Sequence, residues 1–336
     1  MNGWIYYATT LLVYAGVDIL ACLGLSMQFG ISGVVNFGFI LYQAAGAYVA
    51  AVLSLPPSSS NGGFQRYIGG FNLPFPLPWI GAAIIGGLLA IPLGAVVGRK
   101  LRPDYAAIAM LVVAIMANTV ITNFEPIFNG AAGVALVPQP LSETFDPNTE
   151  AYQWAYGIAA VLVAVLIYFV VRRITESPYG RSLRAMRDNG DAAAAVGKHV
   201  RSMRTAMLVV GGAIAALSGA VLVGFITLWA PGAWTYPETI VLFAAIIVGG
   251  LGNHKGAILG ALLVPLAFEE ATRFIPAFGP PGLVPAMEWI CIGLLILVFL
   301  WFRPQGVLPE RKRLGANGGK GKTPILQSPE PAAEAS

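Results

Sequence analysis

Residues Glu176-Ser-Pro-Tyr-Gly-Arg-Ser-Leu-Arg-Ala-Met-Arg-Asp-Asn-Gly-Asp-Ala-Ala-Ala-Ala-Val-Gly197 form a charged stretch in a chain that otherwise has few charges. Apolar spans flank it, at about 153–171 and 205–228. Ser177 followed by Pro178 is typical of a helix N-cap and first turn, and good helix formers continue to Asp188. The stretch therefore predicts a short helix in a loop between two membrane spans.

A second short helix is expected directly after the first. Asn189-Gly190 has the composition of a left-handed helix stop. Asp191 can then cap a helix over Ala192–Val196, which Gly197 would end. Two short helices in sequence predict a compact knob at one face of the membrane.

The first short helix has a basic side and an apolar side. Arg181, Arg184 and Arg187 recur every third residue and form a stripe, while Leu183 and Met186 lie on another side. Two interpretations remain open. The knob docks in a groove of another protein, or it is a solvated basic loop that only fixes the topology.

The composition is that of a polytopic α-helical membrane protein. The chain has 336 residues, of which 57% are hydrophobic and 11% charged, whereas soluble domains carry about 25% charged residues. Apolar runs of about 20 residues can cross a bilayer, and in lipid they must be helical. We expect about eight to ten spans. A broken or re-entrant helix is predicted over 26–55, and the other spans lie at about 4–25, 79–98, 105–124, 153–171, 205–228, 238–252, 256–275 and 286–302.

The charges predict an orientation. Of the 20 Lys and Arg residues, 18 fall in four segments: 99–102, 172–204, Lys255 and the tail from Arg303. The positive-inside rule places these segments in the cytoplasm. The predicted organisation is a transmembrane domain over 1–310 with a cytoplasmic loop at 172–204, outer loops at 56–78 and 125–152, and a disordered basic cytoplasmic tail at 311–336.

Glycines and other small residues recur along the spans. Both halves contain a Gly-interrupted apolar element, Gly30–Gly46 and Val248–Gly260, as expected for repeated halves around a midplane pathway. Small residues four apart, such as Gly211, Ala215 and Gly219, favour close helix packing or a sliding surface. Polar residues within these spans are candidates for the pathway, although buried amides also pair with other helices; they are Gln28, Asn36, Tyr42, Gln43, Asn118 and Asn123.

Ionisable and catalytic groups are sparse. Asp18 is the sole charged residue expected deep in the first half. The other charged residues of the later spans are expected near outer ends, where they reach water; they are Glu238, Glu269, Glu270, Arg273 and Glu288. An ion-coupled carrier needs ionisable groups at depth. The chain has two histidines without metal-ligand spacing, and it lacks the Gly-x-x-x-x-Gly-Lys-Ser/Thr loop of ATPases. These features fit a transport subunit whose energy comes from a separate ATPase better than they fit an enzyme.

Five stretches resemble one known family. Ser177–Asn189 with Ala192–Gly197 is similar to the cytoplasmic coupling loop of branched-chain amino acid ABC importer permeases of the LivH/LivM type. The other four stretches agree in order over about residues 10–310: Phe29-Gly-Ile-Ser-Gly-Val-Val-Asn-Phe-Gly38 with Gly46-Ala-Tyr48, Gly130-Ala-Ala-Gly-Val with Pro138, Val248-Gly-Gly-Leu-Gly-Asn-His-Lys-Gly-Ala-Ile-Leu-Gly260, and Phe302-Arg-Pro-Gln-Gly306.

The resemblance implies a type-II-like importer permease in a bacterial inner membrane. Its partners would be a second homologous permease, expected as a heterodimer, two cytoplasmic ATPase subunits and a periplasmic or lipid-anchored solute-binding protein, with membrane lipid around it and no nucleic acid. ATP would be used by the partners, with no cofactor or metal on this chain. The residues implied in ATPase docking are Ser177, Gly180, Arg181, Arg184, Arg187, Asn189 and Gly197.

One departure concerns the substrate. Where the family commonly has His after Asn-Phe-Gly, this chain has Phe39, in the expected pathway region. Branched-chain or other hydrophobic amino acids are the expected solutes, with urea, short amides or another small organic solute as the alternative. An ion-coupled secondary carrier is the alternative from another class.

Overall fold

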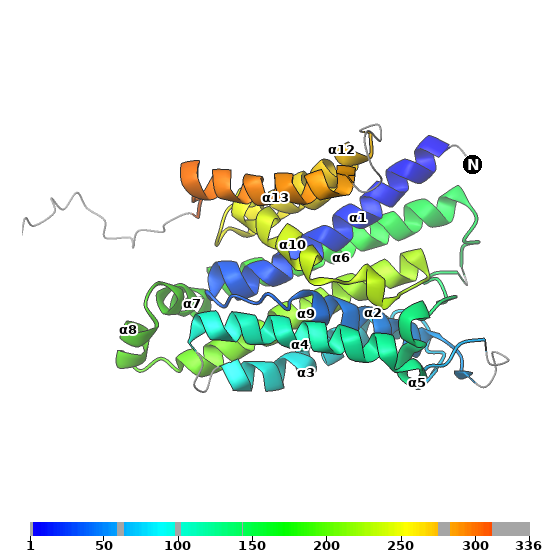
Figure 1. Ribbon diagram of the computed structural model, residues 1–336, viewed down its shortest axis with the longest axis horizontal. Coiled ribbons are helices and arrows are strands. Elements are labelled where there is room, and N and C mark those ends of the chain that lie inside the picture. Colours follow the sequence, from blue (N-terminus) through cyan, green and yellow to red (C-terminus); the bar gives the residue numbers. More distant parts are fainter. Residues whose placement is uncertain (1–2, 59–63, 98–101, 143, 275–282, 311–336) are drawn as a thin grey trace, which may run out of the picture.

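The computed structural model describes residues 3–58, 64–97, 102–142, 144–274 and 283–310. Long helices lie side by side along one direction, with α7 and α8 at one end and α5 and the N-terminus at the other (Figure 1). We call these the α7 end and the α5 end. The helices are α1 Gly3–Leu25, α2 Ile40–Ser54, α3 Leu77–Val97, α4 Pro103–Asn123, α5 Glu125–Phe128, α6 Glu150–Glu176, α7 Pro178–Asp188, α8 Gly190–Ala195, α9 Val200–Ile226, α10 Tyr236–Gly249, α11 His254–Ala261, α12 Glu269–Arg273 and α13 Leu283–Phe302.

Six helical stretches of the described residues are long and apolar enough to cross a membrane. They are Gly3–Ile31, Leu77–Ala95, Asp104–Asn123, Glu150–Glu176, Val200–Ile226 and Pro231–Gly249, and two shorter apolar helices cover Ile40–Ser54 and Ala286–Phe302. The helical polytopic fold is confirmed. Three predicted spans lie outside these six: the interrupted stretches at 26–55 and 256–275, and the stretch at 286–302, which is the continuous helix α13.

Two interruptions take the form of π-helical turns. The first, η1 (Ser26–Ile31), continues α1, and no helix is assigned again until α2 begins at Ile40. The break predicted within 26–55 is therefore confirmed. The second, η5 (Leu262–Phe268), contains Pro265 and separates α11 from α12 inside the span expected at 256–275. Proline removes a backbone donor, which explains the irregular turn at this point.

Helix α9 lies in the middle of the bundle, packed against α1, α2 and α3. Small residues make the approach close. A Cβ on Gly46 of α2 would overlap the backbone of Ala216 in α9, and one on Gly86 of α3 would overlap the Ala216 side chain and lie 2.8 Å from the Gly212 carbonyl. These contacts support the packing interpretation of the small-residue repeats.

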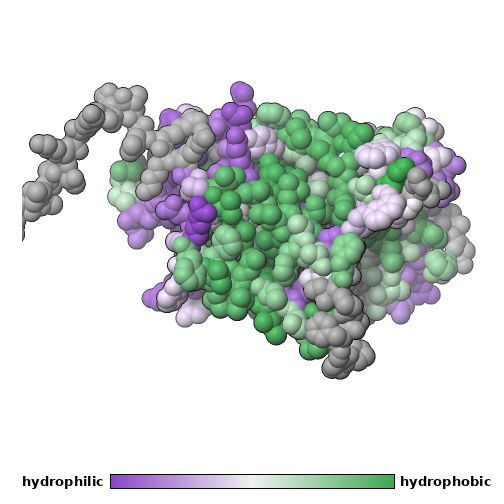
Figure 2. All heavy atoms as spheres, turned by 90° about the horizontal axis from the view of Figure 1, so that it is seen from above, coloured by the Kyte–Doolittle hydropathy of each residue, from purple (hydrophilic) through white to green (hydrophobic). Residues whose placement is uncertain are grey.

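Apolar side chains also cover the outside of the bundle. Figure 2 shows hydrophobic residues across the middle of one face, with hydrophilic residues gathered toward the two ends. Exposed apolar residues occur on α3, α4, α6 and α13, such as Ile84, Val112, Leu166 and Leu297. A soluble protein rarely exposes so much contiguous apolar surface, and this distribution fits a bilayer.

The connecting segments at the α5 end hold one another through short contacts. Single antiparallel bridges join Tyr67 to Phe128 and Val134 to Trp229. Tyr48 of α2 stacks on Phe128 with ring centroids 4.3 Å apart. The two predicted outer loops therefore meet over the same end of the bundle. The predicted disordered tail, 311–336, lies outside the described residues.

Candidate functional site

The predicted knob lies at the α7 end, directly after α6. Ser177 caps α7 as expected, because its Oγ accepts a hydrogen bond from the Gly180 N–H at 3.3 Å and donates one to the Ile174 carbonyl at 2.7 Å. Gly180 is buried, and a Cβ there would overlap the Thr175 backbone. The bend between α6 and α7 thus requires both a capping hydroxyl and a glycine.

The second helix begins differently from the prediction. Asn189 is extended, with φ −154° and ψ 102°, and its Oδ1 accepts from the Ala192 N–H at 2.9 Å. It is therefore the N-cap of α8, and the predicted left-handed stop at Asn189-Gly190 and cap at Asp191 are wrong. Asn serves in both roles, so composition alone did not distinguish them. Gly197 does have the left-handed conformation, with φ +80°, after the end of α8.

The apolar side of α7 is already covered by this chain. Leu183 and Met186 are 0% and 1% exposed and belong to the main hydrophobic core. They anchor the knob to its own bundle. The groove-docking hypothesis loses its apolar anchor, and any partner must contact the opposite side of α7.

Two of the three stripe arginines also face the chain itself. Arg184 Nε lies 2.7 Å from one carboxylate oxygen of Glu310, and Arg187 Nη2 lies 2.8 Å from the other. Arg184 also donates to the Thr175 carbonyl at 3.0 Å, and Arg187 donates to the Gly30 carbonyl at 2.6 Å. All three charged side chains are less than one third exposed, at 31%, 24% and 23% for Arg184, Arg187 and Glu310. We call these three residues the Glu310 cluster.

Backbone pairing brings Glu310 to this position. After α13, the N–H groups of Val307 and Leu308 donate to the carbonyls of Val248 and Gly249 at 2.8 and 2.9 Å. Asn253 Nδ2 lies 3.2 Å from the carbonyls of both Leu308 and Pro309. The segment after the last helix is thus fixed against the turn that follows α10.

The cluster joins the two Gly-interrupted elements. A Cβ on Gly30 would lie 3.0 Å from the Gly252 nitrogen, and a Cβ on Gly252 would lie 2.7 Å from both Arg187 Nη1 and a Glu310 oxygen. Both elements predicted from the two halves therefore meet beneath α7. A movement of α7 would be transmitted to both elements because Arg187 donates to the Gly30 carbonyl and lies against Gly252.

The charges of the Glu310 cluster stabilise the protonated form of Arg187. Burial alone would lower the pKa of Arg187, but the hydrogen bond and charge of Glu310, together with Asp188, raise it above its usual value. Partial burial raises the pKa of Tyr179, which keeps its phenol neutral. The knob therefore carries fixed positive charge, partly neutralised by Glu310.

A smaller set of residues is open to a partner. Arg181, Asn189 and Gly197 are exposed among the predicted docking residues. Tyr179 and Val196, which the prediction did not include, expose 40% and 74% of their surface. We call these five residues the outer face of the knob.

Replacing Ser177 with alanine is expected to loosen α7. The change removes a cap that typically contributes about 1 kcal/mol and leaves the Gly180 N–H without its acceptor. Amide exchange at the first turn of α7 should accelerate by roughly fivefold to tenfold. Ser182→Ala is the control, because the Ser182 hydroxyl bonds, among the described residues, to the Pro178 carbonyl alone, through an exposed hydrogen bond of 3.4 Å. Equal exchange in the two variants would contradict the capping role.

Four of the predicted pathway residues form hydrogen bonds with other groups of this chain. Gln28 donates to the Leu208 carbonyl at 3.2 Å and accepts from Asn36 Nδ2 at 2.9 Å, and Asn36 Oδ1 accepts from the Gly38 N–H at 3.1 Å. Asn118 donates to the carbonyls of Pro231 and Trp234 at 2.9 and 3.1 Å. These three amides hold the fold together. Asn123 donates to the Thr119 carbonyl in its own helix.

The residues near Phe39 lie in two different environments, the core and the wall of a cavity. Phe39 is fully buried, with its ring against Gly24 and 6.5 Å from that of Tyr42. Tyr42 packs on Gly212. The departure at Phe39 therefore lies in the core. Gln43, one turn after Phe39, instead lines a cavity of about 390 Å³ together with Asp18, Glu238, Glu270 and Glu288.

Sequence reasoning missed two features. Glu310, the first acid after the last span, was not among the predicted site residues. Asp18 was expected deep in the first half and the other three carboxylates at outer span ends, and the structure brings all four around one cavity. Among the described residues no group of His, Cys, Asp or Glu has an arrangement suited to a metal ion.

Comparison with known proteins decides the family. Residues 7–300 match the family described as branched-chain amino acid transport system, permease component. The chain belongs to this family. It is 28% identical to a probable branched-chain amino acid transport permease protein LivM of Methanocaldococcus jannaschii, over 90% of this chain and 93% of that protein. No solved structure matches.

Two further relatives show both branches of this permease family. The high-affinity branched-chain amino acid transport system permease protein LivM of Escherichia coli K12 is 27% identical, over 96% of this chain and 74% of that protein. A probable LivH permease of Methanocaldococcus jannaschii is 24% identical, over 88% of this chain and 90% of that protein. The resemblance found in the sequence is confirmed. As a permease component the chain is a multi-pass membrane transport subunit and not an enzyme.

Proposed function

We propose that this chain is the membrane-spanning subunit of an ATP-driven importer of branched-chain or other hydrophobic amino acids. The observation that carries the proposal is the knob at the α7 end. Its inner side is locked to the bundle by Leu183, Met186 and the Glu310 cluster, while its outer face stays open. Such an element can move as a rigid body and transmit a displacement from a soluble partner to the transmembrane helices.

The energy source and the partners are part of the same proposal. Because the sequence lacks a phosphate-binding loop, two separate ATPase subunits would hydrolyse ATP against the knob. A second permease completes the pathway, as a heterodimer, which the existence of both LivM and LivH relatives supports. A periplasmic or lipid-anchored binding protein delivers the solute at the α5 end.

The orientation is part of the proposal. The α7 end, with the basic segment 172–204, is placed in the cytoplasm of a bacterial inner membrane, and the C-terminus lies on the same side. The outer loops 56–78 and 125–152 face the binding protein. Residues 1–310 form one permease domain, and 311–336 form the cytoplasmic tail.

Arg181→Glu tests this function. The residue is exposed on the outer face of the knob and makes no ion pair within the described part of the chain. Reversing its charge should weaken binding to the ATPase subunits at least tenfold, because a close charge pair at an interface contributes about 1.5 kcal/mol or more, while the permease still folds. Co-purification with the ATPase subunits measures this.

A matched control is Arg201→Glu, which reverses another exposed charge of the same predicted cytoplasmic segment, on α9. Transport in proteoliposomes completes the test. Uptake of leucine should require ATP and the binding protein, and the Arg181 variant should lose it. Uptake driven by an ion gradient without nucleotide would refute the proposal and support the ion-coupled carrier.

A further inference from the structure

The cavity beside Gln43 lies in the middle of the bundle and extends toward the α5 end. Its walls come from α1, α2, α9, α10, η5, α12 and α13 and the segment that precedes α10, and its volume is about 390 Å³. Cavities of roughly 300–1,000 Å³ hold small molecules. Apolar side chains form part of the wall; they are Leu11, Val17, Leu222, Val241 and Leu266.

The polar part of the wall is acidic. Asp18, Glu238, Glu270 and Glu288 line the cavity, and its described lining residues include no Lys or Arg. The Tyr7 hydroxyl donates to Glu270 at 2.7 Å, whereas Glu238 and Glu288 make no ion pair to a described residue. Carboxylates at membrane depth are costly unless a positive group compensates them. The part of the cavity beside Glu238 and Glu288 is therefore electrostatically suited to a cation.

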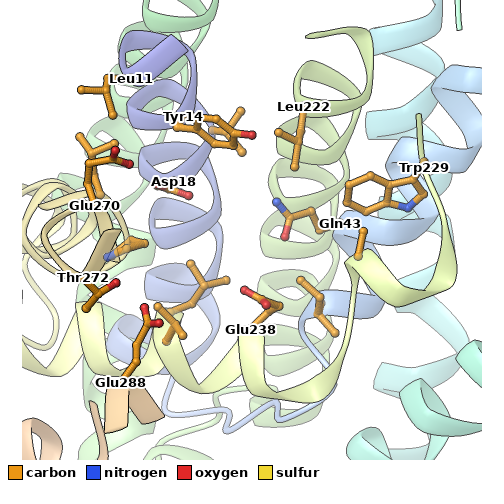
Figure 3. A pocket seen from close by; sticks show the side chains of 17 residues that line it. Leu11, Tyr14, Asp18, Gln43, Leu222, Trp229, Glu238, Glu270, Thr272 and Glu288 are labelled. Carbon is orange, nitrogen blue, oxygen red and sulfur yellow. The ribbon is translucent and has the colours of Figure 1, made fainter. Parts of the chain in front are cut away.

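Gln43 adds an independent indication of a ligand. It is only 7% exposed, and its amide forms no hydrogen bond with the part of the chain that the structure describes. Figure 3 shows the amide of Gln43 and the carboxylates of Asp18 and Glu238 pointing into the same space. A buried amide without a partner costs free energy. A ligand with N–H donors would supply the missing partner, because the amide oxygen accepts hydrogen bonds.

The cavity discriminates between the two substrate alternatives. An ammonium group carries the charge that the carboxylates require and the donors that Gln43 accepts, and an aliphatic side chain matches the apolar wall. Urea and short amides have no ammonium group to place beside Glu238 and Glu288. A zwitterionic amino acid can place its ammonium there when its own carboxylate points away from these two acids. The chemistry favours a solute with both a cationic amine and an apolar part.

We propose that this cavity binds the ammonium group of an aliphatic amino acid, with Glu238 and Glu288 supplying charge and Gln43 supplying the hydrogen bond. The site rests on the proposed function and adds to it the residues of this chain that would hold the solute. It lies within this one chain and shares no residue with the Glu310 cluster.

Binding to the assembled transporter in lipid nanodiscs tests the site. The probes are L-leucine, isoamylamine, which keeps the ammonium without the carboxylate, isocaproate, which keeps the carboxylate without the ammonium, and urea. We expect leucine and isoamylamine to bind, and isocaproate and urea to bind at least tenfold more weakly. Glu238→Gln, Glu288→Gln and Gln43→Ala should each weaken leucine and isoamylamine at least tenfold.

Glu125→Gln is the control, since it removes an exposed acid at the α5 end that does not line the cavity. It should leave binding unchanged. Isocaproate binding as tightly as leucine would overturn the inference. So would unchanged leucine binding in the Glu238 and Glu288 variants, or sodium binding that those variants lose while leucine binding persists. Size-exclusion profiles show whether each variant remains folded, and the three substitutions give independent readings.

ATP-driven uptake is measured separately in the same preparations. Uptake that persists with wild-type affinity in the Glu238 and Glu288 variants would overturn the binding site and leave the importer function intact. Absence of ATP-driven uptake in the unmodified transporter would instead refute the function, while the binding data would still decide whether the cavity recognises ammonium.

Discussion

Replacing Glu310 with alanine is expected to separate ATP hydrolysis from transport. The change leaves Arg184 and Arg187 facing each other across a site that is less than one third exposed. Hydrogen bonds to charged groups contribute about 1.5–3 kcal/mol each. Glu310 accepts one from Arg187 and forms an ion pair with Arg184. Without it, α7 loses its connection to the segment after α13, so motion imposed on the outer face no longer reaches the bundle.

The expected signature is a split between two rates. ATPase activity of the assembled transporter should stay within about threefold of the unmodified rate, whereas ATP-driven uptake should fall at least tenfold. A loss of folding would lower both rates together. Glu310→Asp shortens the side chain and keeps the charge, so it should recover part of the uptake.

Glu176→Ala provides the matched control for Glu310. It also removes an acid that pairs with an arginine at this end, because Glu176 lies 3.4 Å from Arg172, but those two side chains are 36% and 47% exposed. Exposed pairs contribute about 0–1 kcal/mol, so uptake should change little. If Glu310→Ala behaves like Glu176→Ala, the Glu310 cluster has no part in coupling.

The architecture was predictable because the bilayer constrains it strongly. Long apolar runs without charge admit only helices, and the glycines around Gly30 and Gly33 indicated the break before α2. The position of the knob followed from a charged segment between two spans. Each of these predictions depends on local composition, and the structure bears out the helices and the break.

The side that each arginine faces was not predictable. A stripe at every third residue fixes the relative positions of Arg181, Arg184 and Arg187 but leaves open which neighbour each one meets. Burial of Leu183 and Met186 sets the rotation of α7, and that depends on packing against distant helices. Glu310 is 123 positions from Arg187 in the sequence, so nothing local indicates their pairing.

The acidic cavity escaped prediction for a related reason. Each of Glu238, Glu270 and Glu288 lies near the end of a helix, where a long side chain commonly reaches water. Whether it does depends on what the neighbouring helices place beside that end. Here α1 contributes Asp18 and α2 contributes Gln43 to the same space, a convergence that only the assembled bundle creates.

Replacing Gly46 with alanine is expected to abolish the folded protein. A Cβ at this position would overlap the backbone of Ala216 in α9, and backbone cannot move aside as a flexible side chain does. Overpacking of a core costs about 1–3 kcal/mol when side chains can shift, and here α2 would have to move away from α9. That separation would disturb Gln43 and the Gly219 contact on the same helix pair.

The matched substitution is Gly293→Ala in α13, where an added Cβ meets nothing within 4 Å. Both changes add one methyl group to an apolar helix and give the same small gain in helix propensity. The amount of monodisperse protein after detergent extraction measures the difference. We expect Gly293→Ala to match the unmodified chain and Gly46→Ala to yield less than one tenth of it. Equal yields would mean that α2 and α9 are free to separate, and a close, rigid contact between them could not then carry motion from the α7 end.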